Sequence, residues 1–369
     1  MHRGRALLAF LLFAALPASG DLNLGPEELV QAGGIDIDVP GYSVPSFVYW
    51  DGDDLRDLVI GQGSGAYAAK VRVYPNVGTV AHPQFSDYFY AQSDGADLSV
   101  PGSGCLGLFP RVVYWDADGR KDLLVGQADG RVRLFLNVGS DDDPTFDGGT
   151  FLRVGDPIKV DIDVGARATS AVVDWNGDGR KDLVVGALDG KIHVFLNEGT
   201  DTEPDFHSEQ LAQLNSADLV VPTARSSPVI LDLDDDGKKD LLTGNTAGQL
   251  LFYPNTGSEV APSFSYYSMV ESDGAAIDLP GTPRSRPFVC DWTDDGLPDV
   301  LIGAGDGKLH LYQGRCAGDV DGDGDTDLAD LAALLAAYGT SVGDPSYNPD
   351  ADFNGDGQID LSDLAFLLS

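Results

Sequence analysis

The sequence is poor in basic residues and in cysteine. Only 23 lysines and arginines stand against 59 acidic residues in 369, which gives a formal net charge of −36. So negative a chain makes nucleic acid and anionic membrane surfaces poor partners. The three cysteines, Cys105, Cys290 and Cys316, are too few for a disulfide scaffold. One pair could form after export, and the sequence leaves open which.

Long apolar runs are also missing. The one extended run, Ala6–Leu16, is too short to span a bilayer. It follows Arg3 and Arg5 and precedes four small residues, 17–20. This order is typical of an export signal cleaved after residue 20. We therefore expect a secreted, extracellular protein without a membrane span, whose signal peptide is residues 1–20.

Glutamate is scarce as well, since seven of the 59 acidic residues are Glu and 52 are Asp. A solvated acidic helix surface would favour Glu, because Asp is the poorer helix former. Excess Asp is typical of turns and of metal-binding loops. An acidic surface adapted to salt is the alternative for those aspartates that lie outside the loops described next.

An Asp-rich segment recurs five times in a constant context. The copies read YWDGDDLRDLVIG, YWDADGRKDLLVG, DWNGDGRKDLVVG, DLDDDGKKDLLTG and DWTDDGLPDVLIG. The aspartates that close them follow one another at intervals of 58 to 65 residues: Asp57, Asp122, Asp182, Asp240 and Asp299. So regular a period predicts a closed or stacked repeat architecture.

Each repeat contains the parts of one propeller blade. In the third repeat, the short apolar strands 171–173 and 183–185 flank the Asp-rich loop, and an alternating strand follows at 191–196. The motif Asn-x-Gly-x4-Pro-x-Phe comes next, for example at Asn197, and a last strand is expected at 158–164 in the preceding repeat. Four short antiparallel strands per unit describe a propeller blade.

The ends of the repeat region predict ring closure. The fifth repeat stops after residue 312 and lacks its last strand, whereas residues 34–41 match the last-strand sequence of other repeats, such as 276–281. An N-terminal strand that completes the fifth blade would leave no exposed sheet edge at the junction. The fold class is therefore all-β, a five-bladed β-propeller over residues 21–315 whose N-terminal strand closes the last blade.

The Asp-rich loops are candidate calcium sites. In the third repeat, Asp174, Asn176 and Asp178 alternate, Gly179 turns the chain and Asp182 closes the loop. Alternate side chains point the same way, so their oxygens converge, and Ca²⁺ prefers such hard oxygen ligands. Softer metals would require His or Cys, which these loops lack. The alternative is that the loops are Asx-type turns without metal.

These loops resemble the FG-GAP/VCBS calcium repeats of integrin-type and bacterial secreted propellers. The resemblance covers about residues 30–315 and implies Ca²⁺ ligands in the other repeats. In the fourth and fifth they are Asp232, Asp234, Asp236, Asp240, Asp291, Thr293, Asp295 and Asp299. In the first two they are Asp51, Asp53, Asp57, Asp116, Asp118 and Asp122. Tyr49 and Tyr114 replace the first ligand there, so weaker or empty sites are expected.

Two EF-type loops follow Cys316, and each runs into a predicted helix, 328–338 or 361–368. Their candidate ligands are Asp319, Asp321, Asp323, Asp325, Asp327, Asp330, Asp352, Asn354, Asp356, Gln358, Asp360 and Asp363. The pair resembles a type I dockerin, a small α-helical EF-hand-like calcium module, over residues 316–369. The resemblance implies a cohesin-type protein partner, contacted through the helices and through the pairs 328–329 and 361–362.

Three further sets of residues recur at equivalent positions of the repeats and are candidate ligand sites. Trp50, Trp115, Trp175 and Trp292 share one loop position, where we expect packing between blades rather than sugar stacking. Arg167, Arg225 and Arg284 share another, near the mouth of the central channel. They could bind a carboxylate or sulfate of an anionic polysaccharide, or pair with nearby aspartates. His193 and His310 are interpreted as blade-surface residues rather than a catalytic pair.

The sequence therefore favours a non-catalytic binding or adhesion module tethered through the dockerin-like tail, with a polysaccharide or a cell-surface protein as ligand. The first alternative is a carbohydrate-active enzyme on a propeller scaffold, such as a glycoside hydrolase or lyase. Glycoside hydrolysis requires two carboxylates near the axis, and the inner strands contain only the loop aspartates. A structural adhesion protein of the cell envelope is the second alternative.

Overall fold

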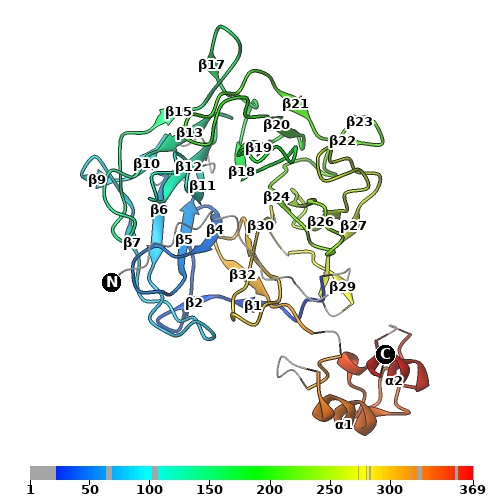
Figure 1. The fold of residues 1–369 in the computed structure, drawn as a ribbon. Helices are drawn as coiled ribbons and strands as arrows, with labels where there is room; N and C mark the ends of the chain where they lie inside the picture. The colour runs from blue at the N-terminus through cyan, green and yellow to red at the C-terminus, as the bar shows by residue number, and fades with distance from the viewer. Residues whose placement is uncertain are drawn as a thin grey trace, which may run out of the picture.

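Short antiparallel strands dominate the molecule, and two helices follow them (Figure 1). The computed structural model describes residues 22–63, 69–101, 107–272, 274–279, 281, 284–316, 318–321, 326–353 and 356–368. The expected signal peptide, residues 1–20, lies outside the described residues, as do Cys105 and the candidate ligands Asp323, Asp325 and Asn354.

Five sheets of four or five strands carry the described repeats. The first contains β4 (Ser43–Val48), β5 (Asp57–Gln62), β6 (Ala69–Tyr74), β7 (Phe89–Tyr90) and β10 (Ser99–Val100). The second contains β11 (Leu108–Val113), β12 (Asp122–Gln127), β13 (Val132–Phe135) and β15 (Thr150–Phe151). The third contains β18 (Thr169–Val173), β19 (Asp182–Gly186), β20 (Ile192–Phe195) and β21 (Gln210–Leu211). The fourth contains β24 (Pro228–Leu231), β25 (Asp240–Gly244), β26 (Leu250–Tyr253) and β27 (Ser268–Met269).

The fifth sheet combines the two ends of the repeat region. Its strand order is β1 (Glu28–Leu29), β32 (Leu309–Tyr312), β31 (Asp299–Gly303) and β30 (Arg286–Cys290). The N-terminal strand β1 runs antiparallel to β32. Residues 34–41 were predicted to fill this place, but they come after β1 and return along the same edge, where Val39 N donates to Gly307 O at 2.9 Å.

The outer strands explain this difference. The expected strand 158–164 contains only β17 (Val160–Asp161), which forms a hairpin with β16 (Arg153–Val154). The strand that pairs with β13 is instead β15, which has two residues and therefore no alternation that a sequence pattern can reveal. The corresponding hairpins elsewhere are β2 (Gln31–Ala32) with β3 (Ile35–Asp36), β8 (Gln92–Ser93) with β9 (Ala96–Asp97), β22 (Gln213–Leu214) with β23 (Ala217–Asp218), and β28 (Glu271–Ser272) with β29 (Ala275–Ala276).

The inner strands contact one another in a cyclic order. β4 contacts β11, β11 contacts β18, β18 contacts β24, β24 contacts β30, and β30 contacts β4 (Figure 1). The close approach requires glycine where the second strand of a sheet ends. A Cβ on Gly303 would lie 2.4 Å from Ser43 O, and one on Gly126 would lie 2.0 Å from Ala168 O. Both distances exclude a side chain at these positions.

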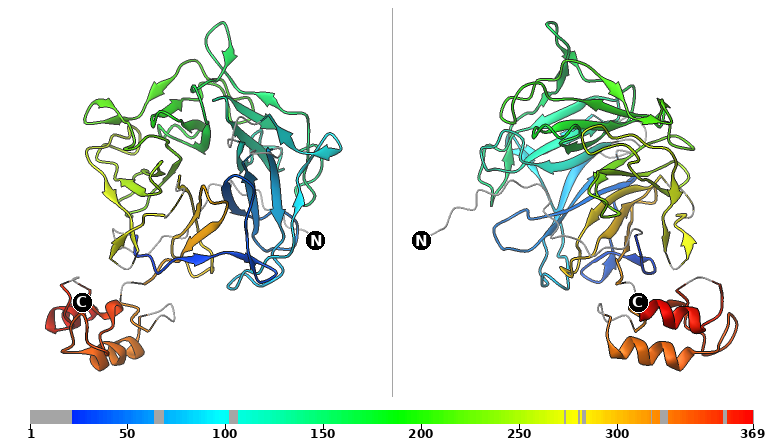
Figure 2. Two further views of the ribbon diagram at one scale, coloured as in Figure 1. Left: turned by 180° about the vertical axis from the view of Figure 1, so that it is seen from behind. Right: turned by 45° about the vertical axis from the view of Figure 1, so that its right-hand side comes forward.

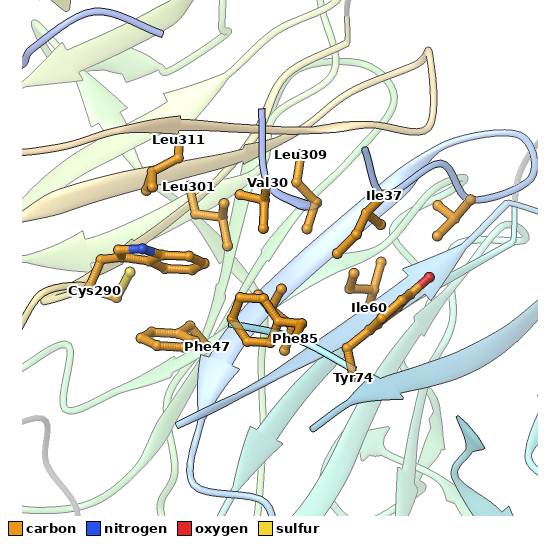
Figure 3. Packing of buried hydrophobic residues seen from close by; sticks show 13 residues of the cluster. Val30, Ile37, Phe47, Ile60, Tyr74, Phe85, Cys290, Leu301, Leu309 and Leu311 are labelled. Carbon is orange, nitrogen blue, oxygen red and sulfur yellow. The ribbon is translucent and has the colours of Figure 1, made fainter. Parts of the chain in front are cut away.

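Each interface between successive sheets holds its own buried apolar cluster. The cluster between the fifth and first sheets is drawn in Figure 3. It combines Cys290, Leu301, Leu309 and Leu311 with Phe47, Ile60, Tyr74 and Phe85, and with Val30 and Ile37 from the N-terminal segment. Because this burial joins the two ends of the repeat region, it stabilises their association by the same hydrophobic effect that joins the other sheets.

The C-terminal module lies beside the sheets in both views of Figure 2. It contains α1 (Leu328–Ala337), the 3₁₀ turn η1 (Pro349–Ala351) and α2 (Leu361–Leu367). Both predicted helices are therefore present, each within one residue of its expected end. An apolar cluster that includes Val320, Leu334, Ala351 and Ile359 packs the helices and loops of the module together.

Candidate metal centres

The closing aspartate of each repeat loop is buried and binds two backbone amides. Asp57 Oδ2 accepts from Trp50 N at 3.1 Å, and its Oδ1 accepts from Asn76 N at 2.7 Å. The same two bonds, one at the start of the loop and one beyond the third strand, recur at Asp122, Asp182, Asp240 and Asp299. The closing aspartate therefore ties the loop to the end of the third strand.

Burial changes the acidity of these carboxyls. It raises the pKa of Asp57, Asp122, Asp182 and Asp240 to about 6 and that of Asp299 to about 7, against the lowering effect of the amides. Neighbouring loop aspartates raise the pKa further by like-charge repulsion. A cation near the loop would oppose both effects and favour the ionised carboxylates.

The fourth repeat brings three of its predicted ligands together. One carboxylate oxygen from each of Asp232, Asp234 and Asp236 lies within 4.8 Å of the other two. Asp232 Oδ2 accepts from Gly237 N at 3.0 Å, whereas Asp232 Oδ1 is buried and has no hydrogen-bond partner in the described ranges. A buried carboxylate oxygen without a donor is costly, so this oxygen suits a cation.

The fifth repeat has the same feature at two positions. Asp291 Oδ1 and Thr293 Oγ1 are buried and have no hydrogen-bond partner within the part of the chain that the structure describes. Asp295 Oδ1 accepts from Leu297 N at 2.8 Å, which turns the loop as the alternating pattern requires. All of these donor atoms are hard oxygens, the ligand type that Ca²⁺ prefers. The residues present therefore fit a calcium ion.

The third repeat orders its loop through its own side chains. Asp174 Oδ1 and Oδ2 accept from Asp178 N and Gly179 N, and Asn176 Oδ1 also accepts from Asp178 N. Arg180 pairs with Asp178. Three of the predicted ligands, Asp174, Asn176 and Asp178, therefore lie on one turn of the chain. Hydrogen bonds of this kind also occur in an Asx-type turn without metal, which was the alternative interpretation of the loop.

The first two repeats differ because tyrosine replaces the first ligand. Tyr114 Oη donates to Asp141 at 3.2 Å, outside the loop. Tyr49 is exposed, with the Arg56 guanidinium 5.4 Å from its ring centre. The remaining candidates Asp51, Asp53, Asp116 and Asp118 accept bonds from amides within their own loops. Each of these loops offers one carboxylate fewer than the loop of the fourth repeat.

In three repeats the basic residue before the closing aspartate links its loop to the preceding repeat. Lys121 Nζ donates to Trp50 O at 3.1 Å, and Lys181 Nζ donates to Trp115 O at 2.9 Å. Arg56 donates to Asp291 O and so links the first repeat to the fifth. The sequence showed these basic residues but gave no sign of their partners.

The first loop of the C-terminal module also gathers carboxylates. One oxygen from each of Asp319, Asp321 and Asp330 lies within 4.8 Å of the other two. Asp330 is fully buried and accepts from Val320 N at 2.7 Å and Asp327 N at 2.6 Å. Asp327 in turn accepts from Ala329 N at 2.6 Å and caps α1. The loop and the start of the helix are therefore one hydrogen-bonded unit.

The second loop repeats this arrangement. Asp360 accepts from Ser362 N and caps α2, and Asp363 accepts from Asp360 N at 2.8 Å. Asp352 accepts from Gly357 N, and Asp356 accepts from the amide of Gln358. The residues directly after the caps, 328–329 and 361–362, are exposed, as a contact role requires.

The arginines predicted near the channel mouth do lie close together. Arg167 is fully buried, and the charges of Arg225 and Arg284 act on it. Arg225 and Arg284 are half-buried. All three have positive φ, 58°, 61° and 71°, a left-handed conformation that is unfavourable for residues with a Cβ. Arg167 donates to Ser226 O and Ser227 Oγ, both at 3.0 Å.

The loop tryptophans pack between sheets, as predicted. Trp50, Trp115, Trp175 and Trp292 are 3 to 5% exposed. Each lies near the Phe of the Asn-x-Gly-x4-Pro-x-Phe motif in the next repeat, in the pairs Trp50–Phe146, Trp115–Phe206, Trp175–Phe264 and Trp292–Phe85. The fourth repeat has Leu233, which shares a buried cluster with Leu24 from the N-terminal segment.

Both histidines of the shared strand position pair with acids. His193 Nδ1 lies 2.6 Å from Glu209, and His310 Nδ1 lies 2.7 Å from Glu27. The two rings are 7% and 4% exposed, so they are more buried than the surface role predicted for them. They lie on different sheets, His193 on β20 and His310 on β32.

Comparison with known proteins identifies two domains in the chain. Residues 174–243 match an FG-GAP-like repeat, and residues 317–368 match a Dockerin type I domain. Over 152 residues the chain is 30% identical to integrin alpha-4 of Xenopus laevis, which covers 37% of this chain and 14% of the integrin. The chain thus spans a small part of that relative's length.

The solved structures that match the chain include a GH43_1 enzyme from Xanthomonas citri and the Tc holotoxin pore of Photorhabdus luminescens. The first is 10% identical with a TM-score of 0.49 and covers 82% of this chain and 93% of its own. The second is 13% identical with a TM-score of 0.40 and covers 80% of this chain and 15% of its own.

In the described part of the chain, no helix combines the length and apolar character needed to cross a bilayer. Type I dockerin domains generally bind calcium, and the carboxylate groups that could hold a metal are present here. The family matches fall on the third and fourth Asp-rich repeats and on the paired EF-type loops. The chain therefore contains an FG-GAP-like repeat at residues 174–243 and a type I dockerin domain at residues 317–368.

Proposed function

We propose that this chain is a secreted, calcium-organised five-bladed β-propeller that binds a ligand without catalysis and is tethered to a partner through its dockerin. The observation that carries the proposal is the exposure of the two helix starts of the dockerin. Leu328 is 75% exposed and Leu361 is 67% exposed, each directly after the capping aspartate of its loop. Dockerin domains generally bind cohesins, so a cohesin-type partner would cover these residues.

The cyclic contacts of the inner strands support five blades. Each of the first four Asp-rich repeats supplies all strands of one sheet, whereas the fifth supplies three strands and β1 supplies the outer strand. The same Trp–Phe relationship that joins neighbouring repeats also joins the fifth repeat to the first, through Trp292 and Phe85. A ring with five equivalent interfaces accounts for both observations.

Calcium binding is supported by the oxygens that lack hydrogen-bond partners in the fourth and fifth loops. Asp232, Asp234 and Asp236, and Asp291 with Thr293 and Asp295, would hold one ion in each loop. Without cations, like charges in each loop repel one another, so calcium and folding are coupled. The first two repeats would bind more weakly, because tyrosine replaces one ligand.

The absence of catalysis is supported by the side chains that converge on the axis. The residues at the two inner register positions are Tyr42, Gly107, Arg167, Arg225, Arg284, Val44, Phe109, Thr169, Ser227 and Arg286, with no carboxylate among them. Glycoside hydrolysis requires a pair of carboxylates, one of them protonated. The closing aspartates use both oxygens to bind backbone amides, which leaves them poorly placed to act as that pair.

The tether can be tested with the whole mature chain and a panel of type I cohesin modules. Calcium-dependent binding is expected, and the double change Leu328→Asp and Leu361→Asp should abolish it. Val138→Asp is the matched control, because Val138 is 62% exposed on the repeat region. Retained binding in the double variant, or no binding to any cohesin, would contradict the proposed tether.

The ligand-binding role has a separate test. The same chain is applied to a glycan array and to cell-envelope fractions, and is incubated with polysaccharides whose reducing ends are then measured. Saturable binding without new reducing ends or unsaturated sugar products agrees with the proposal. Release of either product at a rate proportional to protein concentration would replace it with the enzymatic alternative.

A further inference from the structure

One register position on the five inner strands lines a small cavity where the sheets meet. Each residue at this position lies opposite the glycine at or next to the end of the second strand of its sheet, as in the pairs Val44–Gly61 and Arg286–Gly303. The five residues at this position are Val44, Phe109, Thr169, Ser227 and Arg286, and all of them line one cavity of about 10 Å³. Because every sheet contributes one residue, the cavity lies on the ring axis.

The polar lining of this cavity consists of hydrogen-bond donors. Arg111 and Ser170 complete it beside Thr169, Ser227 and Arg286. No lining residue carries a carboxylate. Ser170 is 3% exposed, and its hydroxyl has no hydrogen-bond partner among the described residues. Ser170 lies one residue beyond Thr169 on β18. The other inner strands have proline at the position that corresponds to Ser170, for example Pro45 and Pro287, so only β18 places a hydroxyl there.

Positive charge accumulates around the cavity. Arg167 is fully buried and donates to Ser227, a lining residue, while its Nε is buried and has no hydrogen-bond partner among the residues described. Arg111 donates to the carbonyls of Pro45 and Pro287. Within the described part of the chain, neither Arg111 nor Arg167 forms an ion pair.

The surroundings make this accumulation costly. Burial lowers the pKa of Arg111 to about 10. Burial, followed by the charges of Arg286, Arg225 and Arg284, holds the pKa of Arg167 well below its ordinary value. Arg286 lies 4.1 Å from the centre of the Tyr42 ring, so the aromatic faces offset part of the cost. A fully buried charge such as that of Arg167, which forms no ion pair within the described residues, otherwise requires a counter-ion.

We propose that one monatomic anion of the halide class binds in this cavity as a structural counter-ion. Arg111, Arg286 and the Ser170 hydroxyl would contact it, and Arg167 would add charge from behind Ser227. The cavity volume of about 10 Å³ is close to that of one water-sized sphere. A halide is somewhat larger than water, so its binding would require the lining side chains to move slightly outward, and a carboxylate or a sulfate would require a larger movement. The charge of Arg167 would then be balanced by a buried inorganic ion rather than by the polysaccharide group expected from the sequence.

The test uses the whole mature chain saturated with calcium gluconate. Sodium chloride replaces sodium gluconate at constant ionic strength while the unfolding temperature is measured. We expect a saturable rise in this temperature, because a ligand that binds only the folded state stabilises it. Crystals grown with sodium bromide should show an anomalous peak within the cavity lined by Ser170 and Arg286.

Ser170→Ala is the informative variant, since it removes one donor without removing a charge. We expect its apparent chloride affinity to fall about tenfold, as for the loss of one hydrogen bond to an ion. Tyr253→Phe is the matched control. It also removes a buried hydroxyl that has no hydrogen-bond partner among the described residues. That hydroxyl belongs to the apolar cluster between the third and fourth sheets and not to the cavity lining.

Three results would overturn the proposal. The unfolding temperature could be equal in chloride and gluconate, sodium sulfate could produce a saturable rise of the same size as chloride does, or bromide crystals could lack the peak. The bromide measurement needs no variant, so it decides the question even where Ser170→Ala fails to fold. None of these measurements depends on the dockerin, so failure here leaves the proposed tether untouched.

Discussion

Phe85 packs on Trp292 with ring centroids 5.6 Å apart, although the two residues belong to the first and fifth repeats. The hairpin of the N-terminal segment also reaches Phe85, since Gly33 N donates to Phe85 O at 3.0 Å. The corresponding phenylalanines Phe146 and Phe206 contact the preceding repeat in the same way. The motif phenylalanine is therefore the point at which each repeat engages the one before it.

Replacement of Trp292 by leucine is expected to destabilise the protein by about 1–3 kcal/mol, because a large buried ring is lost. The double variant with Phe85→Leu should cost less than the sum, since Leu233 and Leu24 already form a leucine version of this contact. Chemical unfolding of both single variants and the double variant gives the coupling free energy. Strict additivity would show that the two rings do not interact.

Trp175 and Phe264 provide the comparison for that cycle, because their centroids lie 6.5 Å apart between the third and fourth repeats. Their coupling should be similar to that of Trp292 and Phe85. If only the Trp175 pair were coupled, the ring would not be closed in solution.

Asp232→Asn should remove one calcium ion from the binding stoichiometry, or weaken that site on the order of tenfold or more, because ligand charge sets affinity. Asp235→Asn is the matched control. It changes the same charge in the same loop, but Asp235 is exposed and is not among the three gathered carboxylates. Calorimetric titration distinguishes the two variants. Equal losses would mean that only net loop charge matters.

Chelation is expected to lower the unfolding temperature, since the loop carboxylates then repel one another. The reverse change can be made in the second repeat, where Tyr114→Asp restores the missing ligand beside Asp116 and Asp118. This variant should bind one additional ion tightly. An unchanged stoichiometry would show that the second loop cannot adopt the calcium-binding arrangement.

Asp330→Ala should unfold the first half of the dockerin. Asp330 accepts bonds from the amides of Val320, Asp321 and Asp327, and the variant leaves these donors buried without partners. Proton–nitrogen NMR spectra of the full chain, followed at the α1 amides, report the loss. Asp350→Ala, which removes only the link to Arg315, is the control and should leave those signals in place.

His310 gives the fifth sheet a pH dependence. Burial alone would lower the pKa of His310, but hydrogen bonds to Asp306 and Glu27 outweigh it, so the pKa is raised. A raised pKa stabilises the folded state fully below the unfolded value of about 6.5, and the stabilisation is lost as the pH rises through the folded pKa. The difference in unfolding temperature between the native chain and His310→Leu should therefore shrink with increasing pH.

The measurement is made with saturating calcium, so that the loop aspartates remain ionised throughout. Leucine is a suitable replacement because Leu251 occupies the same strand position in the fourth repeat. A difference that is independent of pH would exclude the pairing of His310 with Glu27 in solution.

The repeats, their loops and the two dockerin helices could be predicted because their signals are local. Alternating aspartates, a fixed glycine and apolar runs such as 183–185 lie within a few residues of one another. The two-residue outer strands could not be predicted, because Thr150–Phe151 is too short to show periodicity. For this reason the sequence predicts the closing strand at 34–41, whereas the strand that pairs with β32 is Glu28–Leu29.

The hydrogen-bond partners of the loop lysines and of the closing aspartates could not be predicted from the sequence either. Nothing in the sequence tells that Lys121 contacts Trp50 O, or that Asp57 binds amides at both ends of its repeat. The inner-strand position that includes Arg286 and lines the axial cavity could have been predicted. Arg286 follows Arg284 by two positions, and a strand directs alternate side chains to the same face.

The junction of the N-terminal segment with β32 has a mechanical consequence. Arg315 directly follows this sheet, and it exchanges hydrogen bonds with Asn23, with Arg315 N donating to Asn23 O at 2.9 Å. If the dockerin is the point of attachment, any tension between the partner and the bound ligand enters the ring at this pair. The load then passes along the antiparallel bonds between residues 23–30 and 309–315 before it reaches any other sheet. The strength of the attachment under flow is therefore set by the contact that joins the two ends of the ring.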